Sequence, residues 1–465
     1  MITVLESCRV SPPPDVKAEK SLPLTFFDLM WIPFHPLGRV IFFDCPCSTD
    51  RFIQNIVPNL RISLSHALHH FSPLAGNLIK PSNSNSEIDF HIRYAEGDSV
   101  SVVFAECTDD FNYFSGFEAR AADLLKPLVP QLPTGVTRVM VSGEECFASP
   151  LLAIQVTIFP NHGVCFGFTN SHVVADGSSM FSFIRAWASL AKQVMLKESG
   201  SNFPIPDYDR SSIKDVDPLG LRALFKSILG GSGMPEQIEQ NILDQSAGDT
   251  KARVTFVLKQ AHIEALKRLV IQKRPALPYV SSFTMACAYI WTCMAKTRAA
   301  VVKNSEQEPL NFGIAYDCRA RLDPPLPASY FGNCILSSIT AEKREILAGE
   351  EGLYTAAELI GKSLYAKLNN KEGVLKVAGN SQHEFAGIMR GEWYLGVAGS
   401  PKLDYYNTID FGWGKPRKLE FVSEPFSISR CKDSKVDLEL GFVMPKNEVE
   451  VFSSIFAQGL ANASS

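Results

Sequence analysis

The sequence predicts an α/β fold divided between two domains. Its 465 residues exceed the length over which a single hydrophobic core usually grows. Hydrophobic residues make up 46% of the chain and charged residues 20%, as in ordinary globular proteins with substantial cores. Apolar residues alternate as in strands in some segments and recur at helical spacing in others. Strands and helices are therefore expected to be mixed along the chain.

The N-terminal part contains both kinds of pattern. Leu22–Phe43 reads as apolar, strand-like stretches separated by the turn residues Pro33, Pro36 and Gly38. Arg51–Phe71 instead carries apolar residues at the spacing that predicts a helix.

A hairpin followed by a helix is predicted further along this half. Leu151–Phe159 and Val164–Thr169 are strand-like runs joined by four turn residues, Pro160–Gly163. Ser178–Lys192 then carries apolar side chains on one helix face. The sequence NSHVVADGSS between them is therefore expected to form a strand-to-helix turn.

A polar segment from Lys197 to Pro218 predicts an interdomain crossover, because it is rich in Pro, Ser, Gly and Asp. This crossover would divide the chain into residues 1–196, the linker 197–218 and residues 219–465.

The second half begins with elements of both types. Arg253–Lys259 is strand-like, and Ala261–Ile271 has the pattern of an amphipathic helix. A further, more deeply buried helix is predicted over Phe283–Lys296.

Charge and composition exclude several classes of protein. The 45 basic and 49 acidic residues give a net charge of −4, and the pI is about 6.2. This leaves no basic surplus for a nucleic acid or an anionic membrane. The N-terminus lacks the basic flank and apolar stretch of a signal peptide, and no apolar run approaches the ~18 residues of a membrane span. A cytoplasmic protein is expected.

The eleven cysteines follow neither the spacing of a disulfide framework nor that of a zinc site, so reduced thiols are expected. Cys45 and Cys47 lie in the strand-like sequence VIFFDCPC, where only Pro46 separates them. Because free cysteines often pack as small hydrophobic residues, both are interpreted as structural.

Three familiar site motifs are absent or incomplete. The chain has no G-x-S-x-G nucleophile turn. The sequence Gly361–Ser363 ends like a phosphate-binding loop, but Ala356 replaces the first glycine and the segment looks helical. His66 and His70 could share a helix face, yet Ala67 stands where zinc proteases have Glu. They are expected to be surface or capping residues, and no metal site is predicted.

His172 and Asp176 form the first candidate site, at the predicted strand-to-helix turn. Such turns often carry catalytic groups, and histidine suits proton transfer near neutral pH. The carboxylate could orient the imidazole or hold the loop by pairing with an arginine. In a purely structural interpretation, Asp176 and Ser178 would cap the helix and His172 would bond a backbone carbonyl.

The second candidate is the pentad DFGWG, which is a far more specific pattern than a His/Asp pair. Its glycines predict a tight turn packed beneath an aromatic ring, and its aspartate could pair with a basic residue. The pentad consists of Asp410, Phe411, Gly412, Trp413 and Gly414.

Together, HVVADG and DFGWG resemble the signatures of the plant BAHD acyltransferase family. The stretches LPLTFFD, SPLAGNL and YFGNC (Tyr330–Cys334) extend the resemblance over essentially the whole chain. YFGNC in particular resembles the anthocyanin and flavonoid glycoside acyltransferase branch of plant specialised metabolism, many of whose members are malonyltransferases.

The resemblance implies a monomer of two similar-sized, chloramphenicol-acetyltransferase-like domains with mixed sheets and an active-site channel at their interface. An acyl-CoA co-substrate and a phenolic glycoside would enter from opposite ends, without a permanently bound cofactor. His172 would be the general base, which makes the His172–Asp176 motif the catalytic site. Asp176 would turn away from the channel toward an arginine, for which Arg319 is the candidate. DFGWG would support the architecture.

The phosphates of coenzyme A imply basic or hydroxyl groups at its entrance. Ser281 and Ser282 are candidates because they lie near a basic stretch in the sequence. Those cations could equally be the solvated face of the helix that precedes the serines. They are Lys267, Arg268, Lys273 and Arg274.

The donor is less well defined than the base. A malonyl group ends in a carboxylate, for which an arginine is the expected partner. Some malonyl-using relatives carry this arginine near the start of the motif helix, where this chain has Met180, with Arg185 five residues further on. Transfer of malonyl to a sugar hydroxyl is the first hypothesis. Hydroxycinnamoyl (coumaroyl-type) transfer and a catalytically silent acyl-CoA or glycoside binder are the alternatives.

Overall fold

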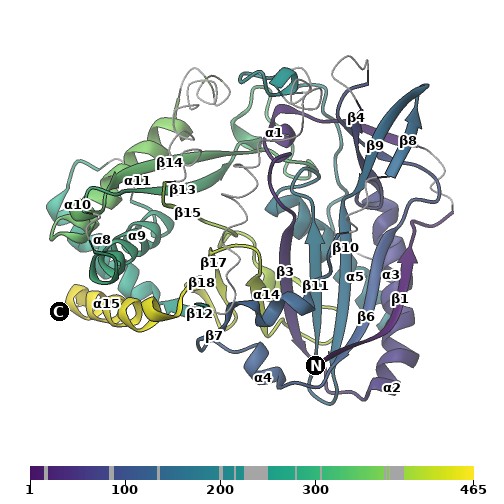
Figure 1. Cartoon of the computed structure of the whole chain (residues 1–465), viewed down its shortest axis with the longest axis horizontal. Helices are drawn as coiled ribbons and strands as arrows, with labels where there is room; N and C mark the ends of the chain where they lie inside the picture. Colours follow the sequence, from purple (N-terminus) through teal and green to yellow (C-terminus); the bar gives the residue numbers. More distant parts are fainter. Residues whose placement is uncertain are drawn as a thin grey trace.

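The computed structural model describes residues 1–14, 19–82, 88–132, 137–197, 203–213, 216–224, 250–277, 280–303, 306–370, 373, 376 and 392–464. Within these ranges, helices and strands are mixed and the strands form four sheets (Figure 1). The predicted α/β class is confirmed. Two large hydrophobic cores lie on the two sides of the molecule, one built mostly from the N-terminal half and one mostly from the C-terminal half.

The largest sheet carries the first core. Its neighbouring strands are antiparallel, except that β6 and β10 are parallel. The predicted hairpin is confirmed as β10 and β11. The strand order is β1 (Ile2–Val10), β6 (Val100–Cys107), β10 (Leu152–Phe159), β11 (Gly163–Asn170), β3 (Leu37–Asp44) and β16 (Lys418–Phe421).

The helices packed against this sheet occupy the predicted segments. Thr49–His70 is helical throughout, as α2 (Thr49–Arg51), a π-helical turn (Phe52–Ile56) and α3 (Val57–His70). The motif helix is α5 (Gly177–Leu196). It is fixed to α3 by Trp187, whose Nε1 donates to Ser63 Oγ at 3.1 Å.

The second core lies on the left of Figure 1, between two sheets and a group of helices. One sheet has the order β17 (Phe426–Cys431), β18 (Ser434–Pro445), β12 (Lys251–Leu258) and β7 (Arg120–Ala121). The other sheet has the order β14 (Ile335–Lys343), β13 (Pro309–Asp317) and β15 (Tyr394–Gly396). The helices are α8 (Gln260–Lys273), α9 (Ser282–Val301), α10 (Arg344–Ala348), α11 (Gly352–Leu368) and α15 (Lys446–Ser464). The predicted strand and both predicted helices of this half are confirmed as β12, α8 and α9.

A five-stranded antiparallel sheet completes the N-terminal side. Its order is β2 (Lys20–Pro23), β5 (His91–Tyr94), β4 (Asn77–Pro81), β9 (Glu144–Pro150) and β8 (Thr137–Val141).

The two halves exchange strands. Strand β16, from the C-terminal half of the sequence, pairs with β3 in the large sheet. Strand β7, from the N-terminal half, pairs with β12 on the other side. The chain therefore passes between the two cores more than once, and the division at residues 197–218 stays a prediction.

The described part of the predicted crossover is packed rather than free. Asp207 forms a parallel bridge with Tyr330, and the Tyr208 hydroxyl donates to His70 O at 2.8 Å. Arg210 is buried, with Nη1 2.9 Å from Asp28 Oδ2. Residues 198–202 and 214–215 of the crossover lie outside the described residues.

One strand-like stretch was misread from the sequence. Within Leu22–Phe43, the residues Phe26–Leu29 form the short helix α1 instead of a strand. The reason is local, because Asp28 Oδ2 accepts hydrogen bonds from both Thr25 N (2.9 Å) and Thr25 Oγ1 (2.8 Å) and so closes a helical turn. Alternation of apolar residues does not reveal such a cap.

All eleven cysteines lie in described ranges and are free, and Cys45 and Cys47 are buried just after β3. Within the described ranges, no group of His, Cys, Asp and Glu side chains could hold a metal ion. Nor does this part of the chain contain a helix with the length and apolar character needed to cross a membrane.

Candidate active site

His172 lies where the sequence places it, in the turn between β11 and α5. Its side chain points into a nearly closed environment, and 9% of the residue is exposed. Three segments surround it: the turn itself, residues that follow β2, and the YFGNC sequence.

Asn333 orients the imidazole. The Asn333 amide nitrogen donates to Asp28 Oδ1 (3.0 Å), His172 O (2.8 Å) and Val173 O (3.1 Å). This fixes Asn333 Oδ1 as an acceptor, and it lies 3.0 Å from His172 Nδ1. Nδ1 must therefore carry the proton, which leaves the lone pair on Nε2. A neutral imidazole with a free Nε2 can accept a proton.

Trp31 covers one face of the same ring. The two rings are stacked, with centroids 3.6 Å apart and planes 12° from parallel. Burial, with a smaller contribution from the charge of Arg39, lowers the pKa of His172 to about 4. The Asp176 carboxylate and hydrogen bonds that include the one to Asn333 oppose this shift without reversing it. The imidazole is therefore neutral at physiological pH.

Asp176 turns away from His172 and into the protein. Its Oδ1 accepts from Ser179 N at 3.0 Å and caps α5, while Oδ2 lies 2.8 Å from Arg319 Nη1. Burial alone would lower the pKa of Arg319, but the paired carboxylate raises it. The two interpretations of Asp176, helix cap and arginine partner, thus describe the same side chain.

The YFGNC segment is held against this ion pair. Arg319 Nη2 donates to Tyr330 O (3.3 Å) and Gly332 O (3.2 Å), and Cys334 N donates to Asp176 Oδ2 (3.1 Å). Gly332 has a φ of 149°, and a Cβ there would lie 2.9 Å from Arg210 Nη2. Glycine is required at this position because backbone and side chains approach closely.

Three sequence motifs therefore meet in space around the imidazole. Asp28, the last residue of LPLTFFD, accepts from Asn333 N at 3.1 Å and pairs with Arg210. Asn333 belongs to YFGNC and His172 to HVVADG. Sequence reasoning assigned no site role to Asp28, Trp31 or Asn333, although two of the three lie within motifs that it quoted.

DFGWG lies at the other end of the motif helix. Asp410 Oδ1 accepts from Gly412 N (2.7 Å) and Gly414 N (2.9 Å), and Oδ2 lies 2.6 Å from Lys192 Nζ near the end of α5. Both glycines have positive φ, 100° and 89°. Phe411 stacks on Phe166 of β11 with centroids 4.2 Å apart. The pentad thus joins α5 to the large sheet.

Trp413 belongs to the same aromatic group. Its ring centroid lies 6.1 Å from that of Phe43 and 6.0 Å from that of Phe166.

The residues predicted for the coenzyme entrance are mostly engaged with one another. Ser281 caps α9 by accepting from Thr284 N, and Ser282 Oγ accepts from Lys267 Nζ, both at 3.0 Å. Lys273 and Arg274 lie 3.1 and 2.9 Å from Glu351 carboxylate oxygens, and Arg268 is exposed. This arrangement is typical of a solvated helix face laced with ion pairs.

Met180 and Arg185 differ in their accessibility to a donor. Met180 has no exposed surface and packs in the first core. Arg185 is partly exposed on α5. Of the two histidines for which no metal site was predicted, His66 is exposed and His70 packs against Phe203 at a ring distance of 5.3 Å.

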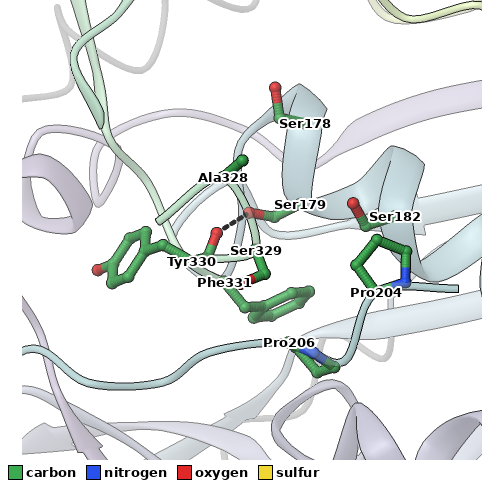
Figure 2. Close-up of a pocket in the computed structure, with 9 residues that line it drawn as sticks. All are labelled: Ser178, Ser179, Ser182, Pro204, Pro206, Ala328, Ser329, Tyr330 and Phe331. Carbon is green, nitrogen blue, oxygen red and sulfur yellow. Dashed lines mark hydrogen bonds between the residues drawn. The ribbon is translucent and has the colours of Figure 1, made fainter. Parts of the chain in front are cut away.

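A pocket of about 270 Å³ adjoins the motif helix (Figure 2). Figure 2 shows the three serines on α5 beside residues 328–331, with the two crossover prolines below them in this view. His172 is not among its lining residues, which are Ser178, Ser179, Ser182, Pro204, Pro206, Ala328, Ser329, Tyr330 and Phe331.

Comparisons with known proteins agree on the type of fold and chemistry. The family model described as "Transferase family" matches residues 1–456. The chain is 38% identical over 99% of its length to malonyl-coenzyme A:anthocyanin 3-O-glucoside-6''-O-malonyltransferase of Dahlia pinnata, of which it covers 98%. It is 41% identical over 91% of its length to phenolic glucoside malonyltransferase 1 of Nicotiana tabacum, of which it covers 90%.

A relative with another donor is also similar. This is coumaroyl-CoA:anthocyanidin 3-O-glucoside-6''-O-coumaroyltransferase 1 of Arabidopsis thaliana, which is 33% identical over 98% of this chain and 97% of its own.

Two solved structures share the fold. The crystal structure of vinorine synthase matches with a TM-score of 0.67 at 20% identity, over 97% of this chain and 96% of its own. The crystal structure of F. sporotrichioides TRI101 complexed with coenzyme A and T-2 matches with a TM-score of 0.61 at 15% identity. The match covers 92% of this chain and 96% of the TRI101 chain. The fold class inferred from the sequence is thereby confirmed.

Proposed function

This chain belongs to the Transferase family, the BAHD acyl-CoA-dependent acyltransferases that its motifs resemble, and we propose that it transfers malonyl from malonyl-CoA to a sugar hydroxyl of an anthocyanin, flavonoid or other phenolic glucoside. His172 is the proposed general base. The acyl-CoA is a co-substrate that leaves after each turnover.

The observation that carries the choice of donor is the difference between relatives. Two malonyltransferases of glucosides are 38% and 41% identical to this chain, whereas a malonyltransferase and a coumaroyltransferase of Arabidopsis thaliana are both 33% identical. Hydroxycinnamoyl transfer to a similar glycoside is the second candidate, because that relative also matches nearly the whole chain.

The hydrogen bond between His172 and Asn333 supports the proposed role of the base. With Nδ1 bonded to the Asn333 oxygen, Nε2 is the nitrogen that can accept the proton of the sugar hydroxyl. The oxygen then attacks the thioester carbonyl carbon and forms a tetrahedral intermediate. When the C–S bond breaks, the imidazolium returns the proton to the sulfur, so the products are the sugar ester and free coenzyme A.

Asp176 and Arg319 are proposed as positioning residues. Their buried ion pair holds the β11–α5 turn and the YFGNC segment, and neither group is turned toward the imidazole. The DFGWG pentad is proposed as a structural support of α5.

The deciding experiment uses purified protein, a panel of phenolic glucosides and either malonyl-CoA or coumaroyl-CoA. We expect release of free thiol together with a malonylated product, and loss of about a hundred- to ten-thousandfold in rate for His172→Ala. Arg268→Ala, an exposed control, should retain full activity.

The other possible outcomes of this experiment would each change one part of the proposed function. Turnover of coumaroyl-CoA alone would replace the proposed donor. No turnover of either donor would favour a silent binder, and full activity of His172→Ala would remove the general base while leaving the transfer reaction intact.

We further propose that the protein is a cytoplasmic monomer. Its eleven free cysteines, ten of them buried, suit a reducing compartment. Light scattering of the purified protein and the location of a fluorescent fusion test the two parts separately.

A further inference from the structure

Arg39 is a buried arginine beside the proposed active site. It lies on β3 and is 3% exposed. Its Nη2 donates to Asn170 Oδ1 at 3.0 Å, and Nη1 approaches the Tyr405 hydroxyl at 3.5 Å. Both partners are neutral, and Arg39 Nε has no hydrogen-bond partner.

This lack of a counter-charge distinguishes Arg39 from four of the five other buried arginines among the described residues. Among the described residues, no carboxylate is in ion-pair contact with it, while four others are paired at 2.5 to 3.3 Å: Arg120 and Arg253 with Glu420, Arg210 with Asp28, and Arg319 with Asp176. Arg344 instead donates to two backbone carbonyls. Burying an unpaired charge is costly, so an anionic group of a ligand that paired with Arg39 would recover part of that cost.

The guanidinium is close enough to act on the imidazole. Its hydrogen-bond partner Asn170 is the last residue of β11, two positions before His172. The charge of Arg39 lowers the pKa of His172. Burial raises the pKa of Glu424 and the charge of Arg39 opposes this shift, but the two side chains form no ion pair among the described residues.

The chemistry of malonyl-CoA requires a cation in this place. Only one methylene separates the malonyl carboxylate from the thioester carbon, and that carbon must lie beside the hydroxyl from which His172 takes the proton. A cation that recognises the carboxylate must therefore be a near neighbour of the imidazole. Met180 has no charge and no exposed surface.

We propose that Arg39 binds the terminal carboxylate of the malonyl donor, with its planar guanidinium donating from Nε and one Nη. The Tyr405 hydroxyl, which faces Nη1, supplies a further donor at the same place. This inference rests on the proposed function and adds to it the residue that selects a dicarboxylic acyl group.

The test compares two donors that differ only in the carboxylate, malonyl-CoA and acetyl-CoA, with one glucoside acceptor. For Arg39→Met, the ratio of kcat/KM for malonyl-CoA to that for acetyl-CoA should fall on the order of 100-fold relative to the unsubstituted protein. Arg39→Lys keeps the charge but not the planar fork, so its ratio should fall by about tenfold. Arg185→Met, the control from α5, should leave the ratio unchanged.

The ratio is measured within one protein sample, so partial misfolding lowers both rates and leaves it unaffected. If Arg39→Met is insoluble, the ratio of kcat/KM for malonyl-CoA to that for acetyl-CoA is measured for Arg39→Lys instead, and a fall in that ratio supports the inference. An equal loss with both donors would overturn the inference while leaving the proposed function in place, because Arg39 would then only hold Asn170 and the turn. An unsubstituted protein that uses coumaroyl-CoA but neither of these donors would overturn the proposed donor and the carboxylate site together.

Discussion

At the scale of single residues, the environment of His172 maintains a neutral imidazole with one defined tautomer. Trp31 removes water from one face of the ring, and the Asn333 oxygen holds Nδ1. The resulting pKa of about 4 is below the ordinary value of 6.5. Because protonation would abolish a general base, the sign of this shift favours activity in acid as well as at neutral pH.

We therefore expect kcat/KM to remain constant from pH 7 to about pH 5 and to fall to half near pH 4. Trp31→Ala should expose the ring and move this acid limb upward toward pH 6.5, the ordinary pKa of histidine. Initial rates over a pH series measure the acid limb of the unsubstituted protein and that of Trp31→Ala. Circular dichroism at each pH confirms that the protein is folded.

Trp393→Ala is the matched control, since that indole packs against the second core and Arg298. It should lower stability without moving the limb. An unsubstituted enzyme whose activity already halves near pH 6.5 would contradict the account of a desolvated imidazole.

At the scale of elements, helix α5 is fixed at both ends by aspartates from different parts of the chain. Asp176 caps its first turn, and Asp410 pairs with Lys192 near its last turn. The first contact is fully buried, whereas the Lys192 and Asp410 side chains are 42% and 33% exposed. The two ends should therefore respond differently to substitution.

Asp410→Ala removes the ion pair and the two backbone hydrogen bonds that shape the DFGWG turn. We expect it to lower the free energy of unfolding by about 1–2 kcal/mol, mainly through those hydrogen bonds. Lys192→Met, which removes only the exposed ion pair, should cost less than about 1 kcal/mol. Urea titration followed by fluorescence measures both values.

The folded fraction of Asp410→Ala should retain most of its kcat, because the pentad contacts α5 and the sheet and not the imidazole. A thousandfold loss of kcat in protein that remains folded would instead give Asp410 a direct part in the chemistry.

At the scale of the whole molecule, a buried charge cluster joins the two sides. Glu420 on β16 contacts Arg120 on β7 and Arg253 on β12. Lys418, also on β16, pairs with Glu439 on β18 at 2.8 Å. The cluster lies where the halves exchange strands, so it couples the two cores.

Glu420→Gln would leave two buried guanidinium groups without a counter-charge. We expect a loss of about 3–5 kcal/mol in the free energy of unfolding, measured by urea titration. Burial alone would raise the pKa of Glu420, but Lys418, Arg253 and Arg120 lower it overall. Its stabilising effect should therefore be complete above the ordinary pKa of 4.5 and be lost progressively as the pH falls from there through the lower pKa of the folded state.

Glu351→Gln provides the surface comparison, since Glu351 pairs with Lys273 and Arg274 in solvent. Its effect on the free energy of unfolding should be much smaller than that of Glu420→Gln, because solvent screens the pair. Equal effects of the two substitutions would mean that the buried cluster does not couple the cores.

The sequence by itself determined the features that depend on local pattern. The period of apolar residues located the β10–β11 hairpin and the helices α3, α5, α8 and α9, because each element buries one face of its own segment. The position of HVVADG between a predicted strand and a predicted helix placed His172 and Asp176 in the turn between β11 and α5, where the structure has them. Alternation failed at Phe26–Leu29, where the Thr25–Asp28 cap overrides it.

Only the tertiary structure decided which distant groups act on the imidazole. Asn333 lies 161 positions from His172 along the chain, and Trp31 and Arg39 come from the N-terminal segment. The pairing of β16 with β3 could not be predicted either, because the sequence of a strand does not show which distant strand it pairs with. The turn that holds the proposed base can be read from its own motif, but the tautomer and pKa of His172 and the charge beside it depend on contacts that exist only after the chain has folded.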